Sequence, residues 1–175
     1  MKRFLVLLGS VLLITACNRA AVHVQNGALV RGSQNIIRDR AGVEVGSVGS
    51  PGVDANGLRL TIWVHDLPPG VHGMHLHEVG LCDHPAFAGA GAHWNPAGRK
   101  HGHQNPQGTH AGDLGNLTVK ADGKGSAEAL VAKGTINSTP SGLAIVIHAK
   151  PDDEKTDPSG DSGDRIACGV VFPAG

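Results

Sequence analysis

Residues 58–65 alternate between aliphatic and other side chains, with Leu, Leu, Ile and Val at every second position. This period of two is typical of a β-strand, in which successive side chains point to opposite faces, and it does not fit the period of a helix. No stretch of the chain carries a long amphipathic helical pattern. The chain is therefore predicted to be all-β, with further strands near residues 36–37, 43–48, 71–77, 114–119, 126–132, 143–148 and 166–172.

Turn signals and two long gaps separate these predicted strands. Asp122-Gly123 is a hairpin signal, and Gly accounts for 26 of the 175 residues, about twice its usual share. Residues 78–113 and 149–165 fit no strand, and loops of that length in a compact domain usually carry a function. One domain is expected from this chain length. We place it at residues 32–175, as a sandwich or barrel with two long functional loops.

The charge balance limits the class of partner. Lys and Arg total 15 and Asp and Glu total 15, so the formal net charge is zero when histidine is neutral. A chain without a basic excess lacks the broad positive surface by which proteins bind nucleic acids. No nucleic-acid partner is therefore expected.

The first residues have the pattern of an export signal, because a short basic start precedes an apolar stretch that is too short to span a bilayer. Residues 1–16, which end in Leu-Ile-Thr-Ala, resemble a bacterial lipoprotein signal peptide. Cys17 is then predicted to be lipidated and to anchor the protein to a membrane. A plain cleavable signal is the alternative. Residues 17–31 are predicted to be a flexible tether. The protein is expected in the bacterial cell envelope facing the periplasm, with Asn18 favouring the outer membrane.

Two cysteines remain besides Cys17. In an exported chain, Cys82 and Cys168 are expected to form one disulfide, because oxidising compartments favour that bond. The alternative is a pair of buried free thiols. A bond between these positions would close a long loop and restrict the unfolded chain.

Histidines are concentrated in one part of the sequence, where 8 of the 11 lie between His72 and His110. His75 and His77 are two positions apart on a predicted strand, so they project from the same face. Paired imidazoles on a rigid strand suit a transition metal. The alternative is a pair that falls on the surface by chance.

A second set combines three histidines with one carboxylate at spacings of 8, 9 and 3 residues: His93, His101, His110 and Asp113. Three imidazoles and one carboxylate complete a four-coordinate zinc site with no open position, which is the structural type. Such a site would order a glycine-rich loop that lacks an apolar core. The alternative is a flexible loop that buffers metals, but such loops have no need for the spaced Gly, Pro and Asp residues found here.

Two further candidates lie far away in the sequence. His148 ends an apolar strand, where a lone histidine is usually a polar residue at the rim. It becomes a candidate ligand only if the fold places it beside His75 and His77. Arg165 lies three residues before Cys168 and is either a surface charge or a guide for an anion.

Several motifs, in order and with matching spacing, resemble the copper/zinc superoxide dismutase family over about residues 42–172. The motifs are His75-Leu76-His77-Glu78, Gly91-Ala92-His93-Trp94-Asn95-Pro96, Lys100-His101-Gly102, His110-Ala111-Gly112-Asp113-Leu114-Gly115-Asn116 and Arg165-Ile166-Ala167-Cys168-Gly169-Val170. The resemblance implies an eight-stranded Greek-key β-barrel or flattened sandwich. The sequence departs from the family at Trp94, where Phe is common. It also places Asp164 directly before Arg165, which would weaken anion attraction if the two paired.

The resemblance also implies a role for each candidate residue. His93 would bridge two metals, and Asp152 would hydrogen-bond one copper ligand and one zinc ligand. Arg165 would attract and orient superoxide, and a disulfide between Cys82 and Cys168 would pin the first long loop. One copper per subunit would be held by His75, His77, His93 and His148, and one zinc by His93, His101, His110 and Asp113.

The implied reaction is dismutation of superoxide to dioxygen and hydrogen peroxide by alternate reduction and oxidation of the copper, with His93 also passing a proton. This reaction would protect the cell envelope. Members of the family occur as monomers and as dimers, so a homodimer is compatible with the resemblance. The pattern gives no role to His72, His84 and His103.

Two other functions fit the sequence less well. A non-catalytic envelope lipoprotein that binds or delivers copper or zinc needs neither Arg165 nor a histidine shared by two metals. A structural adhesion lipoprotein leaves the spacing of 8, 9 and 3 residues unexplained.

Overall fold

The computed structural model describes residues 22–25, 28–31, 35–53, 57–132 and 141–173. The predicted signal peptide, residues 1–16, and Cys17 lie outside these ranges. No helix in the described parts of the chain is long and apolar enough to cross a membrane. The one helical element in these ranges is a short 3-10 helix, η1 (Ala88–Ala90).

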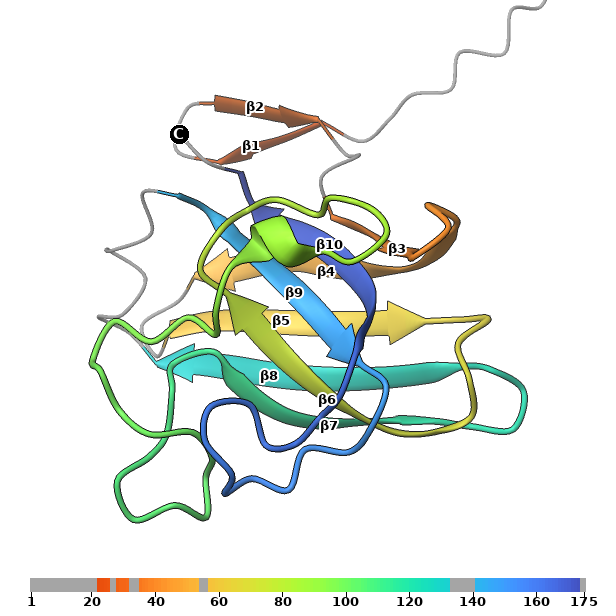
Figure 1. Ribbon diagram of the computed structural model, residues 1–175. Helices are drawn as coiled ribbons and strands as arrows, with labels where there is room; N and C mark the ends of the chain where they lie inside the picture. The colour runs from red at the N-terminus through yellow and green to blue at the C-terminus, as the bar shows by residue number, and fades with distance from the viewer. Residues whose placement is uncertain (1–21, 26–27, 32–34, 54–56, 133–140, 174–175) are drawn as a thin grey trace, which may run out of the picture. The chain divides into compact units, whose positions relative to one another are not determined.

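Eight antiparallel strands close into a barrel (Figure 1) in the order β10-β3-β4-β5-β8-β7-β6-β9. Because β5 pairs with β8 and β6 pairs with β9, the chain crosses between strands that are not consecutive, as in a Greek key. The predicted all-β, eight-stranded fold class is confirmed. The strands are β3 (Ile36–Asp39), β4 (Glu44–Val53), β5 (Gly57–Val64), β6 (Gly70–His77), β7 (Asp113–Val119), β8 (Gly125–Ala132), β9 (Leu143–His148) and β10 (Arg165–Phe172).

Each predicted strand overlaps one strand of the barrel, and β5 shows why the pattern was informative. Leu58, Leu60 and Ile62 are fully buried in the core, whereas Arg59 and Trp63 on the other face are exposed. One buried face and one solvated face produce the period of two in the sequence.

A separate two-stranded antiparallel sheet is formed by β1 (Val22–Gln25) and β2 (Ala28–Arg31). It belongs to a compact unit distinct from the barrel and lies within residues 17–31, the segment assigned to a tether. The polar and small composition of that segment indicated a tether. Val22 and Val24 nevertheless carry a short period-two pattern that is compatible with a strand.

The two strands that position the site are buried on both faces. In β6, Met74 and Leu76 lie in the apolar core, while His75 and His77 on the opposite face are also buried. All six residues of β9 are buried. A strand with two buried faces needs something to cover its second face, and here the covering segments are loops.

Two long loops, residues 78–112 and 149–164, follow β6 and β9. The predicted disulfide is present and joins Cys82 in the first loop to Cys168 in β10. Phe87 is fully buried and packs beside this bond against β9. The first loop is therefore attached to the barrel before it reaches the histidine cluster.

Candidate metal centre

Strand pairing brings together histidines that are far apart in the sequence. In the β6–β9 pair, His75 lies opposite Val146, so His148 at the end of β9 comes close to the histidines of β6. The ring centres of His75 and His148 are 4.8 Å apart. His93 arrives from the first loop, where it forms a β-bridge with His77. We call His75, His77, His93 and His148 the first group. Their candidate ligand atoms all lie within 4.8 Å of one another.

Each ring of the first group has one buried nitrogen without a hydrogen-bond partner: Nδ1 of His75 and Nε2 of His77, His93 and His148. In three of the rings the opposite nitrogen is held by a protein oxygen: His75 by Asp152 Oδ2 at 2.8 Å, His77 by the Gly91 carbonyl at 2.9 Å and His148 by the Gly163 carbonyl at 3.1 Å. Buried polar atoms normally have a partner. A metal ion would supply it, and the outer hydrogen bonds fix the nitrogen that each ring presents.

The second group, His93, His101, His110 and Asp113, is organised around one carboxylate oxygen. Asp113 Oδ1 lies 3.2 Å from His93 Nδ1, 3.0 Å from His101 Nδ1 and 3.2 Å from His110 Nδ1. The other oxygen, Oδ2, accepts hydrogen bonds from the Gly102 and His110 backbone N–H groups and from Thr109 Oγ1. Oδ1 is thus the oxygen turned toward the three imidazoles, as a zinc ligand would be.

His110 rather than His75 completes the second group. Geometry alone also places His75 close enough to His93, His101 and Asp113 to share a metal. However, His75 Nε2 is already bonded to a carboxylate, and its free Nδ1 belongs to the first group. The Nδ1 of His110 is buried, has no hydrogen-bond partner and lies near Asp113 Oδ1. The donor set therefore fits three histidines and one carboxylate.

His93 belongs to both groups. Its Nε2 is unpartnered and faces the first group, while its Nδ1 lies 3.2 Å from Asp113 Oδ1 in the second group. Its ring stacks on His75, with the ring centres 3.9 Å apart. An imidazole that directs one nitrogen at each group can be a ligand of two metal ions.

Asp152 also connects the two groups. Its Oδ2 lies 2.8 Å from His75 Nε2, and its Oδ1 lies 2.9 Å from His101 Nε2. Asn116 holds the backbone of Asp152 with two hydrogen bonds, through Nδ2 to the carbonyl and through Oδ1 to the N–H. The carboxylate is therefore fixed before it orients the two rings.

Burial keeps the imidazoles of the first group neutral. Because the charged form is poorly solvated there, the pKa falls to about 2 for His77, about 3 for His148 and about 4 for His93. Burial also lowers the pKa of His75, although Asp152 opposes the shift. Neutral imidazoles can bind a metal ion at neutral pH without first losing a proton.

The second group, together with Asp152, contains ionised carboxylates and a histidine that is protonated beside them. Burial alone would raise the pKa of Asp113, but hydrogen bonds from His101 and His93 hold it well below its usual range. At Asp152 burial is likewise outweighed by bonds from His101 and His75, which lower the pKa. Burial would lower the pKa of His101, but its two carboxylate partners raise it. The ring of His101 therefore supplies a positive charge between the carboxylates of Asp113 and Asp152, and a divalent cation bound beside it could supply that charge instead.

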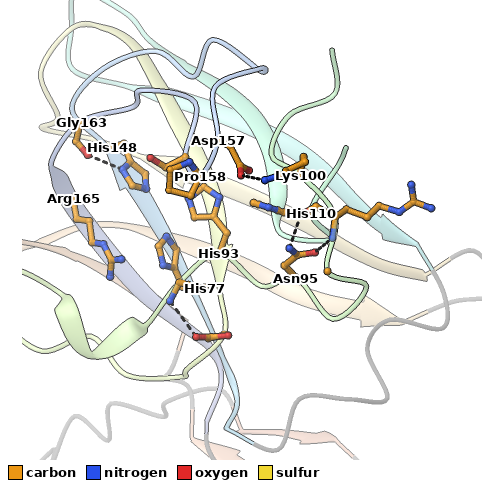
Figure 2. A pocket seen from close by; sticks show the side chains of 15 residues that line it. His77, His93, Asn95, Lys100, His110, His148, Asp157, Pro158, Gly163 and Arg165 are labelled. Atoms are coloured by element: carbon orange, nitrogen blue, oxygen red, sulfur yellow. Dashed lines mark hydrogen bonds and ion pairs between the residues drawn. The ribbon is translucent and has the colours of Figure 1, made fainter. Parts of the chain in front are cut away.

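An open cavity of about 670 Å³ gives solvent access to part of the first group (Figure 2). His77, His93 and His148 line it, and Arg165 faces them from the start of β10. Lys100 from the first loop also lines the cavity. Because Lys100 is paired with Asp157, the cation that the cavity places beside the candidate metal ligands is Arg165, whose charge suits a small anion.

Arg165 is held by the first loop. Its Nη1 donates to the Phe87 carbonyl at 2.6 Å and its Nη2 to the Gly91 carbonyl at 2.7 Å. The Gly91 carbonyl also accepts the hydrogen bond from His77 Nδ1. The guanidinium keeps its charge in proteins, and these two bonds fix the position of that charge beside the first group.

The residues that departed from the family pattern are explained by their surroundings. Asp164 lies 3.5 Å from Arg40, and both side chains are largely exposed. It is therefore the partner of a surface arginine and not of the arginine in the cavity. Trp94 is buried and belongs to the apolar core. His84 and His103 are exposed and lie outside both groups.

Several residues that hold the candidate metal ligands in place through hydrogen bonds were not identified from the sequence. His72 is buried, with Nδ1 2.8 Å from the His148 carbonyl and Nε2 2.9 Å from the Pro68 carbonyl. It thereby fixes the end of β9, yet it lies 76 residues from His148 in the sequence. Asn116 was missed for the same reason, and Thr109 was missed although it lies only four residues from Asp113. Nothing in their local pattern shows which distant or turn-forming group they will hold.

A family model described as copper/zinc superoxide dismutase matches residues 46–171. The chain is 44% identical over 126 residues to superoxide dismutase (Cu-Zn) 1 of Aquifex aeolicus (strain VF5), covering 66% of this chain and 73% of that protein. It is 41% identical over 142 residues to the superoxide dismutase-like protein YojM of Bacillus subtilis (strain 168), covering 77% and 72%. The crystal structure of a SOD-like protein from Bacillus subtilis matches with a TM-score of 0.73 at 40% identity, covering 80% of this chain and 98% of that chain.

Proposed function

Since this chain belongs to the copper/zinc superoxide dismutase family, we propose that it is an oxidoreductase that dismutes superoxide to dioxygen and hydrogen peroxide. The proposal assigns copper to His75, His77, His93 and His148, and zinc to His93, His101, His110 and Asp113. The unpartnered, buried nitrogens of both groups support this assignment. When bound, copper supplies reversible one-electron chemistry, whereas zinc has one oxidation state and shapes the site.

The cavity residues bring the substrate to the site. Superoxide is a small anion, and the fixed guanidinium of Arg165 supplies a positive charge beside His77 and His148. A localised charge can steer a small anion even when the whole protein is neutral, because the field is focused in the cavity. Arg165 thus binds and orients the anion at the exposed side of the first group.

His93 is placed to handle a proton. Its Nε2 is the atom that faces the first group, and its Nδ1 stays beside Asp113. With Nδ1 committed to the second group, Nε2 is the nitrogen of His93 that is free to take up and release a proton beside the first group. Formation of hydrogen peroxide needs two protons, and His93 can deliver one of them at the site.

The observation that carries this function is the combination of a histidine shared by both groups with an arginine fixed in the same cavity. A metal carrier would need neither feature. The test is the decay of superoxide catalysed by the protein loaded with copper and zinc, with metal content measured. We expect a rate constant approaching the diffusional ceiling of about 10⁸–10⁹ M⁻¹s⁻¹, which superoxide dismutases are known to reach.

The variant His148→Ala removes one copper ligand and is expected to abolish the decay, whereas His103→Ala, an exposed histidine outside both groups, is its matched control. Stoichiometric metal without activity in the wild-type protein would refute the enzyme and favour the non-catalytic copper/zinc carrier.

We also propose that the protein acts in the bacterial cell envelope, anchored through a lipidated Cys17 and facing the periplasm, where it removes superoxide. The sequence pattern of residues 1–17 supports this location. The variant Cys17→Ser should keep its fold but should no longer be found in the membrane fraction. If this variant remains as tightly membrane-bound as the wild-type protein, the lipid anchor is wrong.

A further inference from the structure

The carboxylate of Asp157 joins the two long loops at the backbone of a zinc-group residue. Its Oδ1 accepts a hydrogen bond from the His101 backbone N–H at 2.8 Å. Its Oδ2 accepts one from Lys100 Nζ, also at 2.8 Å, as Figure 2 shows. These contacts connect residues 56 and 57 positions apart, so they are tertiary links between the loop 149–164 and the first loop.

His101 is held at both ends by the same loop. Asp157 holds its peptide, and Asp152 lies 2.9 Å from its ring Nε2. With the peptide and the far ring nitrogen both fixed, the remaining nitrogen, Nδ1, is directed at Asp113 Oδ1, 3.0 Å away. The side chain of His101 is completely buried, so water does not replace any of these partners.

The turn that carries Asp157 is closed by its own hydrogen bonds. The Asp153 carboxylate accepts bonds from the backbone N–H groups of Lys155 and Thr156 at 2.9 and 2.8 Å. The Gly160 N–H donates to the Thr156 carbonyl, and the Asp153 N–H donates to the Gly160 carbonyl. These bonds involve none of the candidate metal ligands. The turn can therefore present the Asp157 carboxylate in a defined position before any metal binds.

The neighbouring loop segments fit closely against each other. The Gln104 N–H donates to the Glu154 carbonyl at 3.0 Å. Gly102 has a positive φ of 96° and lies so close to the Glu154 carbonyl that a side chain would collide with it. The contacts of Asp157 thus continue the close packing between the two long loops beside His101.

We propose that Asp157 is a positioning residue for zinc, which holds the His101 peptide so that Nδ1 stays aimed at the metal position. The hydrogen bond to the His101 N–H carries this role, and the ion pair with Lys100 is secondary. The Lys100 side chain is 54% exposed, and exposed ion pairs contribute little. The partly buried His101 N–H, in contrast, would lose its partner without Asp157. This inference rests on the zinc assignment of the proposed function.

Four variants of the purified full chain separate the two bonds. Asp157→Ala removes both bonds, and Asp157→Asn keeps an oxygen acceptor for the His101 N–H without the charge. Asp157→Glu keeps the charge but displaces the acceptor by one methylene. Lys100→Met removes the ion pair alone. Each variant is tested for Zn²⁺ affinity by competition with a chelator, for the absorption spectrum of Co²⁺ bound in place of zinc, and for Cu²⁺ affinity.

We expect Asp157→Ala and Asp157→Glu to weaken Zn²⁺ binding by about tenfold or more, the usual effect of losing an outer partner of a metal ligand. Their Co²⁺ spectra should change, because the direction of one ligand is no longer fixed. Asp157→Asn and Lys100→Met should bind Zn²⁺ like the wild-type protein. Cu²⁺ affinity should be unchanged in all four, because Asp157 bonds no residue of the first group.

Three results would overturn the role of Asp157: wild-type Zn²⁺ affinity in Asp157→Ala and Asp157→Glu, an equal loss in Asp157→Asn, or a parallel loss of Zn²⁺ and Cu²⁺ in every Asp157 variant. A wild-type protein that binds no Zn²⁺ would instead refute the zinc assignment itself. The two failures are therefore distinguishable.

Discussion

Arg165 and His77 donate hydrogen bonds to the same acceptor, the carbonyl oxygen of Gly91, at 2.7 and 2.9 Å. A single atom of the first loop thus fixes a candidate copper ligand and the cation beside it. Because the disulfide between Cys82 and Cys168 attaches this loop to the barrel, the geometry of the cavity depends on the loop as much as on the strands.

Replacing Arg165 with Ala should lower the second-order rate constant for superoxide about tenfold or more, since steering charges raise association rates by at least that factor. The rate should also become less sensitive to ionic strength, because less attraction remains to be screened. Stopped-flow decay at several salt concentrations measures both effects. Arg59→Ala, which removes an exposed arginine from β5, is the matched control. An unchanged rate in Arg165→Ala, with both metals retained, would show that Arg165 does not guide the substrate.

Asp152→Ala should weaken the binding of both metals. The substitution releases His75 in the first group and His101 in the second, and loss of such a partner typically costs about 10–100-fold in metal affinity. Competition with chelators for Cu²⁺ and Zn²⁺ gives the two affinities separately. Asp164→Ala, which removes an exposed carboxylate that pairs with Arg40 outside both groups, serves as the control. If Asp152→Ala binds both metals normally, the rings are oriented by other contacts.

The metal-free protein should lose stability as the pH falls below about 6.5. His77, His148 and His93 have pKa values of about 2, 3 and 4 in the folded state, below their ordinary value. The unfolded chain therefore binds more protons in this window, and each histidine can remove about 1.4 kcal/mol per pH unit. His101, whose pKa is raised, acts in the opposite direction near and above pH 6.5, where the unfolded chain is only partly protonated, so the loss of stability is clearest between pH 6 and 5.

Urea unfolding of the chelator-treated protein at pH 7, 6 and 5 measures this dependence. A free energy of unfolding that stays level or rises toward pH 5 would contradict the neutral, buried state of these rings. His103→Ala should leave the slope unchanged, because its side chain is exposed.

Removing the disulfide should lower the free energy of unfolding, and it should also make the position of Arg165 in the cavity less fixed. The bond joins residues separated by 86 positions, for which the chain-entropy model gives about 4–5 kcal/mol. The double variant Cys82→Ser with Cys168→Ser avoids a free thiol, and its urea midpoint can be compared with that of the wild-type protein. The activity of its folded fraction should also fall, since the Phe87 and Gly91 carbonyls that hold Arg165 lie in the same loop. A loss below about 1 kcal/mol would mean that the loop is held mainly by the packing of Phe87.

The parts of the fold that could be predicted from the sequence are those with a local signature. Strand β5 was visible because one of its faces meets the core and the other meets water. The second group was visible because three of its four ligands lie on one loop and the fourth begins the next strand. In both cases the physical constraint acts on residues that are close in the sequence.

The parts that could not be predicted from residues alone depend on long-range pairing. His148 joins the first group only because β9 pairs with β6, and the resemblance to a family supplied that information. His72 and Asp157 act through backbone groups that lie 76 and 56 residues away. A backbone carbonyl or N–H has no residue identity, so no motif can encode which one a side chain will reach.

The most direct test of the centre is anomalous X-ray diffraction from crystals of the protein loaded with equimolar copper and zinc, with data collected at both absorption edges. We predict a copper peak enclosed by His75, His77, His93 and His148, and a zinc peak enclosed by His93, His101, His110 and Asp113. The His93 ring should lie between the two peaks. A single metal peak, or a zinc peak coordinated by His75 in place of His110, would contradict a two-metal centre that shares His93.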